Sequence, residues 1–331
     1  MTPVMQSAQL FLLAGLAFLA IGALVSFVLV RAVGGRVEQW EARSRHRVIV
    51  LLAALPVLTA AALMLSASLP ALISLVLPGF DHCTVHDDGH AHLCFVHLPK
   101  VGVSTGFALL LVFALSYGIV RAAFAISRVV RAMRVLDLLA GSGDVRSDLG
   151  VTVLKTSQPI CIAAGLLRPR ILLSSGLLES LSADDRAVVL THERAHVRRR
   201  DALIASLVRM LATLHLPVVA RWLVREIDVA AEQACDEEAG KLVGDRVAVA
   251  SAILTVERAL QQAAAPSLSP IAVAFGKRAV ERRVESLLRE PEPPRSLRAI
   301  AAWIGAAAIA VLAGASELHH VTESLLSFIA H

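Results

Sequence analysis

The chain has 331 residues and is 56% hydrophobic, above the roughly 45–50% apolar content of soluble domains. Aromatic residues make up only 4%, so the excess consists of small and aliphatic side chains, which is typical of membrane-spanning sequence. The net charge of +5 would suit nucleic-acid binding, but the arginines lie beside apolar runs and no nucleic-acid motif is present. Four cysteines are too few for a disulfide-rich scaffold. Composition therefore predicts an integral membrane protein that contacts lipid, and it excludes direct nucleic-acid binding.

Four apolar runs predict transmembrane helices. Three of them fall within residues 1–127, at about 8–30, 48–77 and 101–126, and a shorter, Ala-rich run lies at 299–316. The first three are long enough to cross a hydrocarbon core of about 30 Å. The first run predicts a retained span rather than a cleaved signal peptide, because no basic residue precedes it and arginines follow it.

The positions of Lys and Arg predict which side of the membrane each loop occupies. Residues 1–7 and the tail 317–331 contain neither, and the loop 78–100 contains only Lys100. The positive-inside rule therefore places both termini and this loop outside the membrane, and it places the block 128–298 inside, in the cytosol. The basic segments that support this arrangement are 31–47, 121–134 and 277–298.

The predicted outside loop is rich in histidine, and two interpretations of it stay open. Imidazole and thiolate groups suit zinc and copper, so the loop could be a metal- or pH-responsive sensor. An oxidising compartment would also permit a Cys83–Cys94 disulfide that closes a short polar loop. The residues concerned are His82, Cys83, His86, His90, His92, Cys94 and His97.

The cytosolic block carries a zinc motif inside a predicted helix. Ser182, followed by two aspartates, predicts the N-cap of a helix over about 183–200. His192-Glu193-x-x-His196 lies in the middle of that helix. Its two histidines are four residues apart, so both imidazoles can reach one ion. Glu193 is placed to act as a general base.

A third ligand is expected from the acidic segment 225–241, which predicts a second helix. Glu232 and Asp236 are four residues apart and share one face of it. Spacing alone does not choose among the acidic residues Glu226, Asp228, Glu232, Asp236, Glu237 and Glu238.

HERAH, followed by Glu232-x-x-Cys235-Asp236 and preceded by PRILLSSGLL, resembles the BlaR/MecR-type membrane metallopeptidases. These are gluzincins related in their catalytic core to the CAAX-prenyl and HtpX membrane proteases, and the resemblance covers roughly residues 1–316. It implies one catalytic Zn²⁺ bound by His192, His196 and Glu232, with Asp236 near the ligands. It also implies that Ile171, Leu172, Leu173 and Ser174 form an edge strand that binds an extended substrate.

The expected fold is therefore a multi-pass α-helical membrane protein with about four spans and a cytosolic, mainly α zinc protease domain that contains a small β-sheet. By resemblance, the protein is an antirepressor that cleaves a cytosolic DNA-binding repressor of the BlaI/MecI type. The fifteen residues after the fourth span are too few for the penicillin-binding sensor domain of the β-lactam receptors. No self-cleavage site is identified.

Two other functions stay open: an HtpX-like quality-control protease, and a non-catalytic receptor that senses metal. The substrate, the inducing signal and the oligomeric state, a homodimer included, are not determined by the sequence.

Two further segments carry expectations. Residues 202–224 are apolar enough for a fifth span, but His196 and Glu232 must meet at one ion, so this segment cannot cross the membrane once. We expect a hairpin, an interfacial helix or part of the domain core, with His215 as a core or interfacial histidine rather than a ligand. Residues 276–290 predict an amphipathic basic helix held at the anionic inner leaflet.

Overall fold

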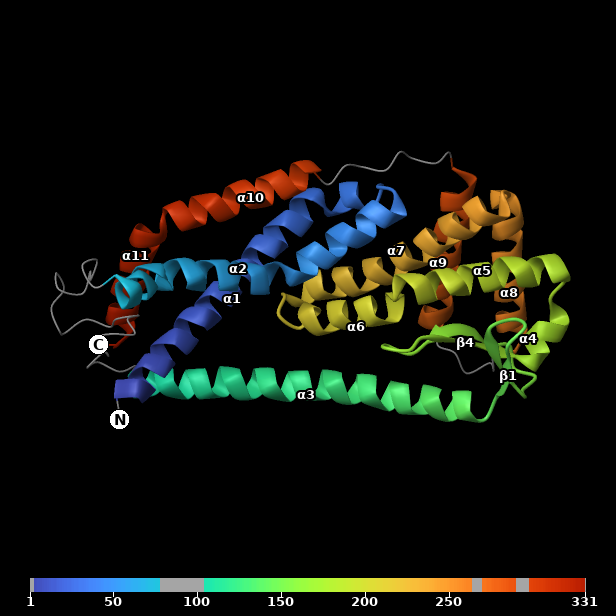
Figure 1. The fold of residues 1–331 in the computed structure, drawn as a ribbon, viewed down its shortest axis with the longest axis horizontal. Helices are drawn as coiled ribbons and strands as arrows, with labels where there is room; N and C mark the ends of the chain where they lie inside the picture. The colour runs from blue at the N-terminus through green and yellow to red at the C-terminus, as the bar shows by residue number, and fades with distance from the viewer. Residues whose placement is uncertain (1–2, 78–103, 264–269, 290–297, 331) are drawn as a thin grey trace.

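The computed structural model describes residues 3–77, 104–263, 270–289 and 298–330. Long helices make up one end of the elongated molecule, and one of them continues beneath the small sheet and shorter helices at the other end (Figure 1). The His- and Cys-rich loop from His82 to His97 lies outside the described residues, so its two interpretations stay predictions.

Among the described residues, three helices are long and apolar enough to cross a membrane. They are α1 (Pro3–Val37), α2 (Ala42–Val76) and α3 (Thr105–Gly141); α1 contains the first predicted span, and α2 and α3 contain most of the second and third. The helices are longer than the apolar runs because their basic ends continue the helix beyond the hydrocarbon-length core. α1 and α2 pack together as a hairpin through residues such as Leu10, Ala14 and Ala67.

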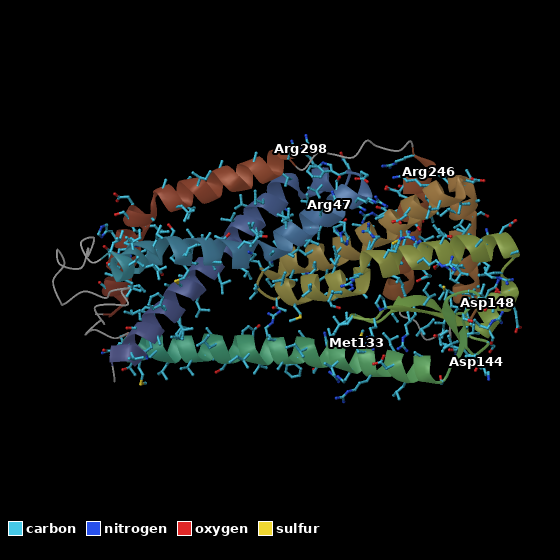
Figure 2. All side chains as sticks on the ribbon, in the orientation of Figure 1. Arg47, Met133, Asp144, Asp148, Arg246 and Arg298 are labelled. Carbon is cyan, nitrogen blue, oxygen red and sulfur yellow. The ribbon has the colours of Figure 1, made fainter. Side chains whose placement is uncertain are left out.

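The predicted fourth span coincides with α10 (Arg298–Ala313), and α11 (Ala315–Ala330) follows it. With 16 residues, α10 is shorter than the roughly 20 residues that a perpendicular span needs, so the four-span count stays a prediction. α11 packs against α2. Arg47, near the start of α2, and Arg298 both lie on the side of the long helices that faces the sheet-containing half (Figure 2).

A four-stranded sheet forms after α3, in the order β1-β2-β4-β3. β2 and β4 are parallel, whereas β3 and β4 are antiparallel. The expectation that Ile171–Ser174 is an edge strand is wrong, because Ile171, Leu172, Leu173 and Ser174 belong to β4, which lies between β2 and β3. All four residues are buried, as expected for a strand paired on both sides. The strands are β1 (Asp144–Arg146), β2 (Val151–Leu154), β3 (Cys161–Ala164) and β4 (Arg170–Ser174).

Within the described residues, six helices pack with this sheet region. Residues 202–224 form a helical hairpin, one of the three expected arrangements, because α6 ends at Ala212 and α7 starts at Pro217 and packs back along it. His215 in the turn is buried and bonds through Nε2 to the Ala53 carbonyl oxygen of α2, 3.0 Å away, which confirms a core role. The helices are α4 (Ser175–Ser180), α5 (Ala183–Arg199), α6 (Asp201–Ala212), α7 (Pro217–Val243), α8 (Arg246–Ala263) and α9 (Pro270–Leu288).

Candidate metal centre

Helix α5 presents two histidines side by side. The Ser182 hydroxyl accepts a hydrogen bond from the Asp185 amide at 3.0 Å, which confirms the predicted N-cap. Leu190 faces the core formed with the sheet, and this contact fixes the rotation of the helix. His192 and His196 then lie on the opposite face of the helix, with their Nε2 atoms 3.1 Å apart.

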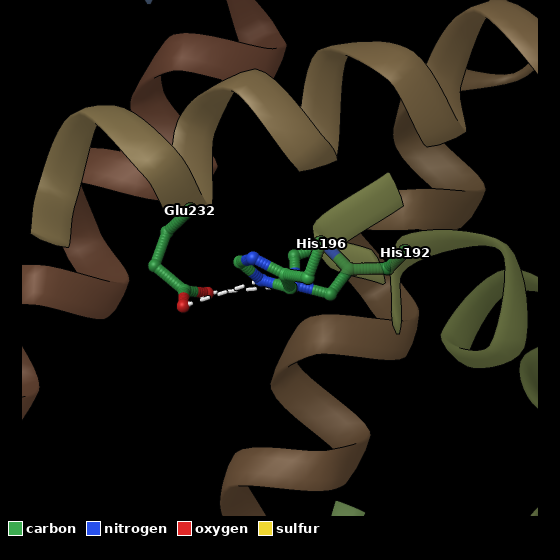
Figure 3. Close-up of side chains that lie close together, drawn as sticks. All are labelled: His192, His196 and Glu232. Carbon is green, nitrogen blue, oxygen red and sulfur yellow. Dashed lines mark hydrogen bonds and ion pairs between the residues drawn. The ribbon is translucent and has the colours of Figure 1, made fainter. Parts of the chain in front are cut away.

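Helix α7 adds a carboxylate to this pair. The Glu232 oxygens lie 3.5 Å from His192 Nε2 and 3.5 Å from His196 Nε2 (Figure 3). Tetrahedral zinc with bonds of about 2.0–2.2 Å separates its donor atoms by roughly 3.3–3.6 Å. Both histidine–carboxylate separations fall in this range and the 3.1 Å between the imidazoles lies slightly below it, so the three side chains form a group whose donor chemistry and spacing suit one zinc ion.

A second residue of α7 lies behind His192. Asp236 Oδ1 is 2.9 Å from His192 Nδ1, as expected for a carboxylate that orients a metal-binding imidazole. Arg283 of α9 pairs with both Asp236 oxygens at 2.8 Å and with Glu232 Oε2 at 3.0 Å. One arginine thus holds both carboxylates in place.

Sequence reasoning missed the corresponding partner of His196, which is Asp201. The His196 Nδ1–H donates to Asp201 Oδ2 at 2.9 Å. Five residues separate the two, a spacing that a continuous helix would turn away from a shared face. Arg200 breaks the helix with a left-handed φ of 54°, so that α6 starts at Asp201 and returns its side chain to α5. A non-glycine residue gives no sequence signal for such a turn.

The charges around the site favour a cation at its centre. Burial lowers the pKa of His192, but Asp236 and Glu232 outweigh that effect and raise it to about 10. Burial would raise the pKa of Glu232, yet Arg283 and both histidines lower it. With both Nδ1 atoms turned toward carboxylates, the two Nε2 atoms face each other, and a shared positive ion satisfies both.

The surroundings of Asp201 lower the pKa of its carboxyl group and so favour the carboxylate. Burial raises its pKa, and the hydrogen bond from His196 and the charge of Arg199 lower it further than burial raises it. The Cys235 thiol donates to Asp201 Oδ2 at 3.4 Å, and burial together with Asp201 raises the pKa of that thiol. Cys235 is thus a neutral donor to Asp201, and its sulfur remains free.

The three ligand-type side chains open into a cleft of about 430 Å³. Glu193 lines it from α5, and Cys161, Ile162 and Ala163 of β3 also line it. Burial and the neighbouring Glu193 raise the pKa of the Cys161 thiol. The strand that borders the cleft is therefore β3, a true edge of the sheet, rather than β4.

Three other acidic residues of the segment 225–241 pair with arginines instead of joining the histidines. Glu226 pairs with Arg282, and Glu238 pairs with Arg43 and Arg198. Asp228 pairs with Arg209 at 2.7 Å, at the margin of the same cleft. Glu232 is thus the acidic residue of α7 that joins the two histidines.

The expectation that a basic helix at 276–290 lies at the inner leaflet stays a prediction, but two of its central arginines have protein partners. Arg282 and Arg283 turn toward α7 and form ion pairs with buried carboxylates. A helical pattern with basic residues cannot distinguish a lipid-facing surface from one that meets acidic residues of another helix.

Comparison with known proteins agrees with this geometry. The family model for the BlaR1 peptidase M56 matches residues 101–287, which is more than half of the chain. No curated protein and no solved structure gives a significant match. The chain belongs to the BlaR1 peptidase M56 family, and its apolar helices and family together indicate a membrane metallopeptidase.

Proposed function

We propose that this member of the BlaR1 peptidase M56 family is a zinc endopeptidase whose site lies between α5 and α7. The observation that carries the proposal is the convergence of His192, His196 and Glu232 on one point at the floor of a cleft. When bound there, zinc lowers the pKa of water and polarises a carbonyl group.

Glu193 is the proposed catalytic residue. It lines the cleft one position after His192, so its carboxylate can accept a proton from the attacking water. The water oxygen adds to the scissile carbonyl carbon, and Glu193 then passes the proton to the amide nitrogen as the C–N bond breaks. Asp236 and Asp201 hold the two imidazoles in the tautomer that directs Nε2 toward the metal.

An extended peptide substrate would lie along β3. Among the described residues, β3 pairs with β4 alone and lines the cleft, so its other edge can add a substrate strand. The substrate is a cytosolic DNA-binding repressor of the BlaI/MecI type, which we infer from the family. The same inference places the protease block on the cytosolic face of a bacterial inner membrane, in agreement with the positions of the basic residues.

Replacing the proposed base tests the assignment. We expect Glu193→Gln to reduce cleavage of a co-expressed repressor by at least about 100-fold, the lower range for general-base catalysis. Zinc content should stay at one ion per chain, because Glu193 is not a ligand. Glu179→Gln, an equivalent change at an exposed residue of α4, is the matched control and should retain activity. Undiminished cleavage by Glu193→Gln would refute the proposal.

A further inference from the structure

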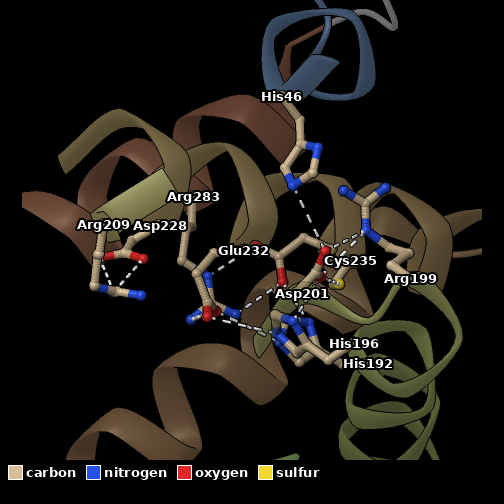
Figure 4. A network of polar contacts seen from close by, with 11 residues as sticks. His46, His192, His196, Arg199, Asp201, Arg209, Asp228, Glu232, Cys235 and Arg283 are labelled. Atoms are coloured by element: carbon tan, nitrogen blue, oxygen red, sulfur yellow. Dashed lines mark hydrogen bonds and ion pairs between the residues drawn. The ribbon is translucent and has the colours of Figure 1, made fainter. Parts of the chain in front are cut away.

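The start of α2 reaches the metal centre from behind. His46 is buried, and its Nε2 lies 3.7 Å from Asp201 Oδ1 (Figure 4). The preceding residue, Arg45, bonds to Gln233 of α7, which is the neighbour of Glu232 in sequence. Two adjacent residues of a candidate membrane span thus contact the metal centre region. His46 contacts Asp201 at the start of α6, and Arg45 contacts Gln233 of α7.

Asp201 is the point where these contacts converge on a ligand. Its Oδ2 accepts from His196 Nδ1 at 2.9 Å and from the Cys235 thiol at 3.4 Å. Arg199 Nε reaches both carboxylate oxygens at 3.2 Å. His46 faces the Oδ1 side. Any change in the position of this carboxylate is transmitted to the His196 ring through one hydrogen bond.

The Nε2 atom of the His46 imidazole has no hydrogen-bond partner among the described residues. A buried polar nitrogen usually has one, because leaving it unpaired costs about 1–3 kcal/mol. A shift of about 0.5 Å toward Asp201 would bring Nε2 within the normal range of roughly 3.2 Å. The nearby carboxylate is therefore the natural acceptor for the His46 N–H.

We propose that His46 is a positioning residue that sets the orientation of His196 through Asp201 and so links the first turns of α2 to the metal centre. The inference rests on the proposed zinc site. Loss of a direct partner of a metal-bound histidine weakens metal binding by about 10–100-fold, and His46 acts one step further away, so we expect roughly 3–10-fold. A displacement of α2 would then alter the site without any contact to substrate.

Three variants of the full chain in detergent micelles test this link. His46→Leu fills the volume but removes the donor, and His46→Gln retains an N–H at the position of Nε2. Arg43→Ala is the matched control, since it breaks an exposed ion pair between α2 and Glu238 of α7 that does not touch the ligands. Zinc affinity is measured by chelator competition, and the visible absorption spectrum of the Co²⁺-substituted protein reports the ligand geometry.

We expect His46→Leu to bind zinc about 3–10-fold more weakly and to shift the Co²⁺ spectrum. His46→Gln should restore both within about twofold, and Arg43→Ala should match the wild type. Equal behaviour of the Leu and Gln variants, or no change in His46→Leu relative to Arg43→Ala, would overturn the positioning role. A wild-type chain that binds no zinc would instead overturn the proposed function, so the two failures are distinguishable.

Discussion

Two adjacent arginines of α9 meet two different carboxylates of α7. The packing pair is Arg282 with Glu226, joined by contacts of 3.2 and 3.0 Å, and the ligand pair is Arg283 with Asp236, joined by two contacts of 2.8 Å. Both carboxylates are almost fully buried, at 0% and 1% exposure. Among the described residues, only the ligand pair contacts an imidazole, and its Arg283 lines the cleft of the candidate metal centre, whereas Arg282 lines a separate pocket. The difference shows that a buried ion pair alone does not identify a functional site.

The largest contrast between the pairs should come from removing Asp236. Asp236→Ala leaves Arg283 without its bidentate partner and frees His192 Nδ1. Removing one partner of a buried pair costs about 3–5 kcal/mol in the free energy of unfolding. Zinc affinity should fall by about 10–100-fold as well. Chemical unfolding and chelator competition measure the two effects, and unchanged zinc affinity would show that Asp236 does not orient His192.

The same kind of change in the packing pair should affect stability alone. Glu226→Gln keeps the shape of the side chain but loses the charge that pairs with Arg282 and Arg225. We expect a loss of about 1.5–3 kcal/mol in the free energy of unfolding, the range for hydrogen bonds to charged groups. Zinc affinity should match the wild type within about twofold. A tenfold loss of zinc affinity would show that the two pairs are coupled through α9.

Acid should weaken the packing pair and so lower the free energy of unfolding. Burial would raise the pKa of Glu226, but Arg282 and Arg225 lower it below its ordinary value of 4.5. A carboxylate with a lowered pKa in the folded state stabilises the protein above its unfolded pKa, and this contribution is lost as the pH falls through the folded value. The unfolding free energy of the metal-free wild type should therefore decrease below about pH 4.5.

Glu226→Gln provides the control for this pH dependence, because glutamine does not titrate. Its unfolding free energy should fall less steeply over the same range, with chelator present to exclude any contribution from metal. Parallel curves for the two proteins would mean that Glu226 is not responsible for the acid sensitivity.

Local patterns in the sequence were sufficient to predict the two ligand histidines and the helix face that carries Glu232 and Asp236. The cap at Ser182 and the four-residue spacings of His192 with His196 and of Glu232 with Asp236 are properties of single helices. A helical period places such residues on one face before any tertiary contact is known. The same reasoning excluded a single crossing by residues 202–224, since both helices must meet at one ion.

The remainder depends on contacts between distant segments. The strand order that makes β3 rather than β4 the edge results from pairing across the whole sheet, which alternation of side chains does not encode. Asp201 reaches His196 only because Arg200 adopts a left-handed conformation, which the sequence does not indicate. His46 contacts Asp201 although it lies 155 positions earlier in the chain. From the sequence, Arg282 and Arg283 belong to a basic helix surface. The structure pairs them with the buried carboxylates Glu226 and Asp236 of α7.

The smallest expected effect comes from a paired conservative change that tests whether geometry or charge matters in each pair. Arg283→Lys keeps the positive charge but loses the planar fork that binds Asp236 at two points and Glu232 at a third. We expect zinc affinity to fall by a few fold, because Glu232 and Asp236 would share a single ammonium group. Arg282→Lys, the matched control, should change the unfolding free energy by about 1 kcal/mol or less and leave zinc affinity unchanged, since the Arg282 side chain is 33% exposed and its charge can be replaced by solvated lysine. If both variants bind zinc like the wild type, Arg283 acts only through its charge, and the ligand pair differs from the packing pair in its location alone.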